Sequence, residues 1–152
     1  MGRNILAVIV GYVTMFAIVF LALTIAFLAM GTDLAFQQGS FQVSPMWLVV
    51  MYIISLLAAL AGGWVTATIA PRRNAVLALV VLVVILGILS AVPALSAAET
   101  PDVRSGDLSN MEAMMNARQP PWVALSIPII GAVGAWLGGQ RRLKAGLGKG
   151  SV

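Results

Sequence analysis

The sequence contains no cysteine and no histidine. Without cysteine the chain has no disulfide bonds, no thiolate metal sites and no thiol nucleophile. Without histidine it lacks the commonest acid–base catalyst, the usual zinc ligand and the usual axial ligand of haem. Charged residues are also few, at 9% of the 152 residues, whereas 61% of the residues are hydrophobic. This composition excludes an ordinary soluble globular domain.

Long apolar stretches take up most of the chain. They cover residues 4–30, 45–70, 75–96 and 121–139. At a rise of about 1.5 Å per residue, each stretch is long enough to cross a hydrocarbon core roughly 30 Å thick as an α-helix. We therefore predict a single all-α integral membrane domain, in which four transmembrane helices form two hairpins. The longest polar segment is residues 97–119, and residues 141–152 form a basic tail.

The charged residues predict how the chain is oriented in the membrane. When the polar segments are assigned alternately to the two sides, one side receives all five acidic residues: Asp33, Glu99, Asp102, Asp107 and Glu112. The other side receives seven of the nine basic residues: Arg3, Arg72, Arg73, Arg141, Arg142, Lys144 and Lys149. Basic flanks stay in the cytoplasm during insertion. Both termini are therefore predicted to be cytoplasmic, with residues 97–119 as an outer loop.

The net charge of +4 does not indicate a nucleic-acid partner. The basic residues flank membrane spans instead of lining a folded basic face, so the partner that they predict is the lipid bilayer. Trp47 and Trp122 lie at the outer ends of the second and fourth spans, where indole rings anchor a helix at the headgroup boundary. The predicted anchors at the inner ends are Arg72, Arg73, Arg141 and Arg142.

Local sequence signals predict where two helices begin. Ser44 followed by Pro45 is typical of an N-cap and a proline at the first helical position. Ser109 and Glu112 have the spacing of a capping box. A short amphipathic helix beginning there, in the second outer loop, places three methionines on one face: Met111, Met114 and Met115.

Small residues recur at every fourth position in two of the spans. They are Ser55, Ala59, Gly63 and Ala67 in the second span, and Gly131, Ala135 and Gly139 in the fourth. This spacing lets two helix backbones approach closely, so it predicts a packing seam between these spans, within one subunit or between subunits. The alternative is that small residues are simply common in membrane helices. The third span is apolar on every side and is expected to face lipid.

Few residues are suited to chemistry. No acidic or basic residue lies within the four spans, which argues against an ion pump, a proton relay or a voltage sensor. The cluster of Met111, Met114 and Met115 has two interpretations: the apolar face of an interfacial helix, or a soft thioether site for Cu(I). No other metal site, no cofactor and no catalytic residue is predicted, so the chain is not expected to be an enzyme.

One stretch resembles a known group of proteins. Residues 61–73 contain Gly62-Gly63-Trp64 and end in Pro71-Arg72-Arg73. The stretch resembles small bacterial four-helix inner-membrane proteins, in which a double glycine and an aromatic residue precede a small-residue helix end and a basic turn. The resemblance covers little more than one helix. It implies a multi-pass protein of the bacterial inner membrane and carries no site residues with it.

The features present and absent favour a non-catalytic role. The leading hypothesis is an accessory or scaffolding subunit that packs against a larger membrane complex through its small-residue helix faces. Its expected partners are the lipid bilayer and either other membrane proteins or further copies of itself. Two alternatives remain: a small transporter or channel for a neutral solute, and outward-facing Cu(I) handling by the methionine cluster.

Overall fold

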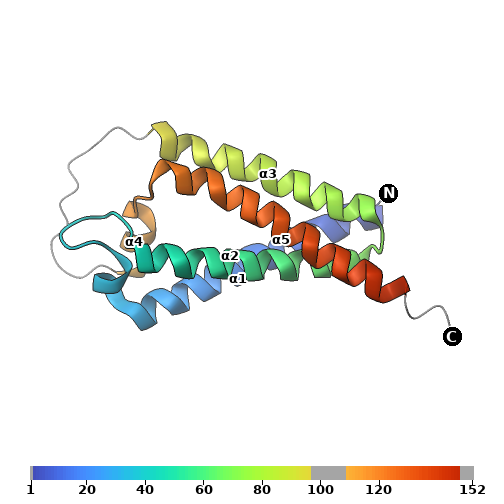
Figure 1. Cartoon of the computed structure of the whole chain (residues 1–152), viewed down its shortest axis with the longest axis horizontal. Coiled ribbons are helices and arrows are strands. Elements are labelled where there is room, and N and C mark those ends of the chain that lie inside the picture. Colours follow the sequence, from blue (N-terminus) through green and yellow to red (C-terminus); the bar gives the residue numbers. More distant parts are fainter. Residues whose placement is uncertain (1, 97–108, 148–152) are drawn as a thin grey trace.

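A computed structural model describes residues 2–96 and 109–147 (Figure 1). Within these residues it contains five helices: α1 (Gly2–Ala35), α2 (Pro45–Ile69), α3 (Arg73–Ser96), α4 (Asn110–Asn116) and α5 (Pro121–Leu147). Four of them, α1, α2, α3 and α5, are long and apolar enough to cross a membrane. The protein is therefore all-helical, as predicted. The loop acids Glu99, Asp102 and Asp107, together with Lys149 and the rest of the tail beyond Leu147, lie outside the described residues.

The helix starts follow the predicted local signals. The Ser44 side chain caps α2 by accepting a hydrogen bond from the backbone N–H of Trp47 at 3.1 Å, and Pro45 occupies the first turn. The Ser44 hydroxyl also donates to the carbonyl oxygen of Leu34 at 2.5 Å, which ties the start of α2 to the end of α1. Gly31 interrupts α1 with a φ of 74°, a conformation that favours glycine. One further helical turn follows this kink.

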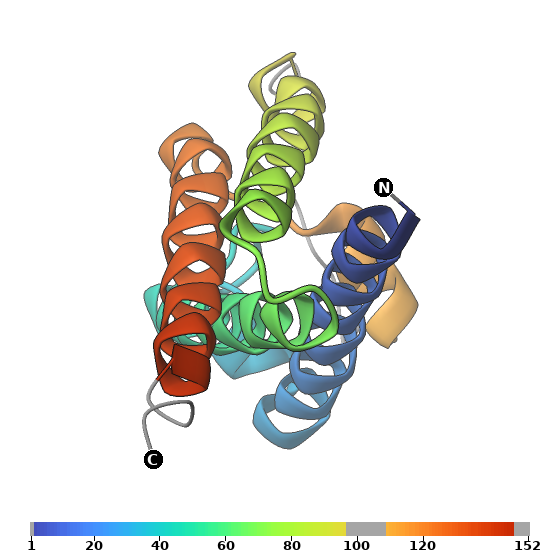
Figure 2. The same cartoon turned by 90° about the vertical axis from the view of Figure 1, so that its right-hand side faces the viewer.

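The helix α2 lies between two neighbours. It packs along α1 on one side and along α5 on the other, and α5 packs in turn along α3 (Figures 1 and 2). The contacts of α3 with α1 and with α2 are much smaller, and the backbones of α1 and α5 do not approach each other. The four long helices therefore form a bundle with three extensive interfaces and two small ones, which α3 makes with α1 and with α2.

Small residues form the interface between α2 and α5. A Cβ atom on Gly63 would overlap the carbonyl oxygen of Ala135, and one on Gly138 would overlap the carbonyl oxygen of Leu60. Backbone carbonyls cannot move aside as the end of a side chain can. These glycines are therefore required for the observed separation of the two helices, and the close approach increases the dispersion contact between them.

The opposite face of α2 approaches α1 equally closely. A Cβ atom on Gly11 would overlap the hydroxyl group of Thr66, and one on Gly62 would overlap Met15. Thr66 is fully buried, and its hydroxyl group donates to the carbonyl oxygens of Gly62 at 2.9 Å and Ala7 at 3.2 Å. The two glycines Gly62 and Gly63 thus serve two different interfaces.

The helix α3 has a buried face, although its sequence is apolar on every side. Val76 and Leu79 are fully buried, and Val83 is 8% exposed. Gly139 and Gly131 of α5 adjoin Val76 and Val83, respectively, so the glycines of the partner helix determine which face of α3 is covered. Val81, Ile85 and Leu89 on its other side are exposed, so the expectation that this helix faces lipid applies to that side only. Its uniform hydrophobicity contains no periodic signal that separates the two faces.

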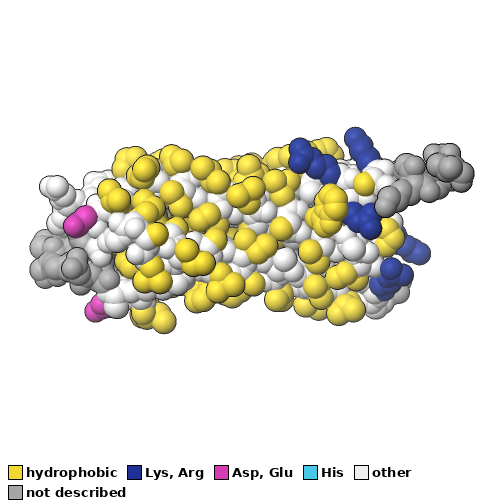
Figure 3. All heavy atoms as spheres, turned by 90° about the horizontal axis from the view of Figure 1, so that it is seen from below, with side chains coloured by type: hydrophobic (Ala, Val, Ile, Leu, Met, Phe, Trp, Pro, Cys, Tyr) yellow, Lys and Arg dark blue, Asp and Glu magenta, His cyan; other side chains and the backbone are white. Residues whose placement is uncertain are grey.

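Arginines tie the helices together at one end of the bundle, which we call the basic end. Arg3 Nε donates to the carbonyl oxygen of Ile69 at 2.6 Å. Arg142 Nε donates to the Thr68 hydroxyl at 3.1 Å, and its guanidinium lies 5.9 Å from the centre of the Trp64 ring. The contact with Thr68 and Trp64 is possible because α5 continues as a helix beyond the predicted span, to Leu147. Figure 3 shows the basic side chains at this end and acidic ones at the other, with a hydrophobic band between them.

We predict that Gly63→Ala or Gly138→Ala destabilises the bundle by about 1–3 kcal/mol, because the added methyl group meets backbone that cannot yield. The measurement is unfolding in mixed detergent micelles. Gly146→Ala is the control, since a Cβ atom there would lie 3.8 Å from the nearest atom, on Arg142. Equal stability of all three variants would contradict the packing described above.

Candidate functional site

A cavity of about 450 Å³ lies where the weak α1–α3 contact leaves the bundle incompletely packed. Its walls come from α1, α2, α3 and α5, and include Tyr12, Ser55, Val83 and Pro128. Ser55 is 9% exposed and Val83 8%, so this part of the wall is deep in the bundle. Ser90, which also lines the cavity, is exposed. The cavity therefore extends from the interior of the bundle to its surface; we call it the bundle cavity.

A second cavity, of about 270 Å³, adjoins the first beneath α4. Val19, Ala117 and Gln119 line both. The second cavity is rich in aromatic side chains: Phe16, Phe20, Phe27, Phe36 and Trp47. We call it the aromatic cavity. The shared residues make the two cavities neighbouring parts of one apolar site, which lies in the half of the bundle remote from the basic end.

The walls of the two cavities offer a few neutral polar groups. The hydroxyl oxygen of Thr24 is buried and has no hydrogen-bond partner among the described residues. This is unusual, because a threonine within a helix commonly donates to the carbonyl four residues earlier. Pro128 has no N–H to donate to the carbonyl of Ala124, and both residues line the bundle cavity. The site thus combines an unused hydroxyl donor with apolar walls.

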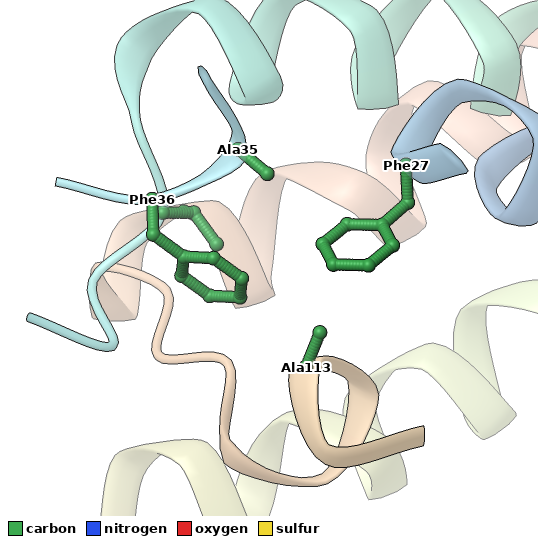
Figure 4. Packing of buried hydrophobic residues seen from close by; sticks show 5 residues of the cluster. Phe27, Ala35, Phe36 and Ala113 are labelled. Carbon is green, nitrogen blue, oxygen red and sulfur yellow. The ribbon is translucent and has the colours of Figure 1, made fainter. Parts of the chain in front are cut away.

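The helix α4 forms one wall of the aromatic cavity. Ala113, on its inner face, packs against Phe27 of α1 and Phe36, which follows α1 (Figure 4). The Phe27 ring also meets the rings of Phe36 and Trp47 edge to face, at centroid distances of 6.4 and 6.1 Å. Such aromatic pairs add to the stability gained from burial. This cluster holds α4 across the end of the bundle.

Backbone hydrogen bonds between two loops fix the position of the segment after α4. The N–H of Val43 donates to the carbonyl oxygen of Arg118 at 3.0 Å, and the N–H of Arg118 donates to that of Phe41 at 2.9 Å. The first loop and the segment after α4 are therefore paired. As a result Ala117 and Gln119, on either side of Arg118, are placed where both cavities meet.

The predicted capping box at the start of α4 is present. Glu112 Oε2 accepts hydrogen bonds from the backbone N–H of Ser109 at 3.0 Å and from its hydroxyl group at 2.7 Å. The hydrogen bond from the side chain of Ser109, and then that from its backbone, lower the pKa of Glu112 below its ordinary value. A lowered pKa means that Glu112 stabilises the cap when it is ionised.

The structure divides the predicted seam residues between two interfaces. Ala59 and Gly63 of α2 adjoin Gly134 and Ala135 of α5. Gly131 and Gly139, by contrast, lie against α3, as described above. Ala67 is buried in α2, and Ser55 contributes to the wall of the bundle cavity. The small-residue positions of α5 are therefore shared between its contacts with α2 and α3.

The predicted anchors also occupy different environments. Trp122 is 58% exposed and stacks on Tyr52 at a centroid distance of 6.5 Å, whereas Trp47 packs in the aromatic cluster. At the basic end, Arg142 is engaged by Thr68 and Trp64. Arg73 and Arg141 instead line a separate surface groove. Arg72, at the turn before α3, is exposed.

The three methionines of α4 are mostly at the surface. Met111 is 65% exposed, Met114 52% and Met115 78%. Met114 also lines the aromatic cavity, and its sulfur accepts a 4.0 Å hydrogen bond from the Asn110 side chain. In the described part of the chain no group of three or more Asp and Glu side chains is placed to hold a metal ion.

Comparison with protein-family models, with curated proteins and with solved structures finds no match to the chain. The fold and the site therefore define its class: an all-helical protein with four helices suited to crossing a membrane, and with an apolar site between them that uncharged side chains line in the described part of the chain.

The sequence did not predict this site. Its wall residues are scattered over five helices, and most are ordinary apolar residues of a membrane span. Two signals were available: Pro128, which removes a backbone hydrogen bond within α5, and the phenylalanines Phe16, Phe20 and Phe27 on one side of α1. Neither specifies a cavity without the positions of the neighbouring helices.

We predict that Ser109→Ala loosens α4, because it removes the cap of the first turn, worth about 1 kcal/mol. Amide exchange across Asn110–Asn116 should then be about fivefold faster. Because the pKa of Glu112 is lower in the folded chain, the stability that this residue contributes is present above its unfolded pKa. That stability is lost as the pH falls through the folded pKa. Unchanged exchange in the variant would show that the packing of Ala113 alone holds the helix.

Proposed function

We propose that this chain is a non-catalytic membrane protein that holds the apolar part of a membrane lipid in the bundle and aromatic cavities. The observation that carries the proposal is the extent of the bundle cavity, from the buried residues Ser55 and Val83 to the exposed residue Ser90. Its volume of about 450 Å³ lies in the range of sites that hold small organic molecules, roughly 300–1,000 Å³.

The chemistry of the walls selects the class of ligand. Among the described residues, no acidic or basic side chain lines either cavity, which favours a ligand whose enclosed part carries no charge. The hydroxyl group of Thr24, which has no partner among the described residues, is free to donate one hydrogen bond. A hydrocarbon chain that carries an ester or hydroxyl group matches these walls.

The proposal includes how the bundle is oriented across the membrane and in which membrane it lies. The basic end faces the cytoplasm by the positive-inside rule, and both termini lie there. The two cavities then lie in the outer half of the membrane, beneath α4. The bacterial inner membrane is proposed as the location from the resemblance of the stretch around Gly62-Gly63-Trp64.

A transporter for a neutral solute is a second candidate that the same cavities favour. Between the bundle cavity and the basic end, however, Thr66, Val76 and Leu79 are fully buried between closely packed helices. Passage of a solute across the membrane therefore requires this half of the bundle to open. Binding requires no such change, which is why it is the preferred function.

The accessory-subunit hypothesis relied on small-residue faces that would pack against a partner. Gly62 and Gly63 are both covered within the chain, by α1 and α5. These two glycines are therefore not available to a partner, and no described residue identifies another docking surface. Cu(I) handling likewise stays a prediction, resting on the exposed sulfurs of Met111, Met114 and Met115.

A photoactivatable lipid tests the proposed function. The probe is a phospholipid with a diazirine in the middle of one acyl chain, incorporated into vesicles with the full-length protein. Lipid in the cavity should label Ser55, Val83 and Ala91, which lie in its wall but are at most 9% exposed. Lipid around the bundle labels only exposed residues such as Leu125.

A variant that fills the cavity provides the comparison. Ala124→Leu places three further carbon atoms in the bundle cavity and should reduce labelling of Ser55 and Val83 severalfold. Leu125→Phe adds bulk at the neighbouring position, which is 48% exposed, and should leave labelling of these two residues unchanged. Labelling confined to exposed residues in the unmodified protein would rule out lipid binding in the cavity. Flux of a neutral solute without such labelling would favour the transporter.

A further inference from the structure

A second site of different chemistry lies at the basic end. A groove of about 470 Å³ runs between the start of α3 and the last turns of α5. It is lined by Arg73, Trp136, Leu137, Gln140, Arg141 and Lys144. Three positively charged side chains from two helices therefore face a hollow whose remaining walls are largely apolar.

The basic residues at this end fall into two groups. Arg3 and Arg142 make contacts that hold the bundle together, with Ile69 and with Thr68 and Trp64. Arg73, Arg141 and Lys144 make no ion pair with another described residue. The described acidic residues are Asp33 and Glu112, and both lie toward the opposite end of the bundle (Figure 3). The three groove cations thus have no negative partner within the described part of the chain.

This arrangement favours an anion that comes from outside the chain. Three like charges around one hollow repel one another unless an anion lies between them. Arginine and lysine are the usual partners of phosphate, which arginine can contact through two hydrogen bonds. The complementary ligand is therefore a phosphate group.

The apolar neighbours of the groove indicate that the phosphate belongs to a lipid. Trp136, in the groove wall, is 41% exposed. Val133 and Ile129 follow on the same face of α5, one helical turn apart, and are 49% and 63% exposed. This stripe runs from the groove into the hydrophobic band of the bundle, where it meets acyl chains. A soluble phosphate compound has no hydrocarbon chain that could cover this apolar stripe.

We propose that this groove binds the headgroup of an anionic phospholipid, with the phosphate between Arg73, Arg141 and Lys144 and an acyl chain along Trp136 and Val133. The site is independent of the bundle and aromatic cavities, since it lies at the other end of the bundle and selects lipids by charge. The groove discriminates between anionic and neutral headgroups in the leaflet at the basic end, whereas the cavities bind an uncharged chain.

The test is a titration of the full-length protein with phosphatidylglycerol or phosphatidylcholine, with bound lipid counted by native mass spectrometry. Arg141→Gln with Lys144→Gln should weaken binding of phosphatidylglycerol about tenfold and leave phosphatidylcholine unchanged. Arg73→Gln, on the other wall of the groove, should weaken it in the same direction. This third change keeps the test informative if the double variant folds poorly.

The matched control removes the same net charge elsewhere. Arg72→Gln takes one positive charge from the residue next to Arg73, outside the groove, and should retain the affinity for phosphatidylglycerol. Equal losses in Arg72→Gln and Arg73→Gln would overturn the proposal in favour of general electrostatic attraction. Unchanged binding in the groove variants would overturn it outright. Displacement of the lipid by equimolar inorganic phosphate would also overturn it, by identifying the groove as a site for soluble anions.

Discussion

The close approach of backbones on both sides of α2 is the constraint on which the rest of the structure depends. Gly62 admits α1 and Gly63 admits α5, so consecutive residues of one helix set the positions of two neighbours. In α5, too, two consecutive glycines serve two interfaces: Gly138 faces α2 and Gly139 faces α3. Three tight interfaces of this kind leave α1 and α3 only weakly in contact, and the bundle cavity lies at that place.

The two ends of the bundle are built on different principles. At the basic end, side chains of Arg3 and Arg142 tie α1 and α5 to the last turn of α2. At the other end, the first loop and the segment after α4 pair through backbone hydrogen bonds, and the aromatic rings beneath them line a cavity. The packing is tight near the arginines and open near α4. This difference explains why the two cavities lie in the α4 half of the bundle.

Local features could be predicted from the sequence, whereas those that depend on helix placement could not. Ser44 and Pro45 mark the start of α2, and Ser109 with Glu112 marks α4, because caps are made by residues close together in the chain. The small residues of α2 and α5 were recognisable by their spacing. Their assignment to particular neighbours was not, since Gly131 and Gly139 pack against α3 rather than α2. The cavities are spaces left between helices that are far apart in the sequence, so no short sequence signal predicts them.

The most direct test of lipid binding is a crystal structure of the full-length protein grown from a lipidic mesophase. If the cavities hold a lipid, elongated density should run from the α1–α3 contact past Ser55 toward Thr24, with α4 in place over the aromatic cavity. An empty site, in which α1 has moved onto α3 and closed the space around Val83, would contradict the proposal.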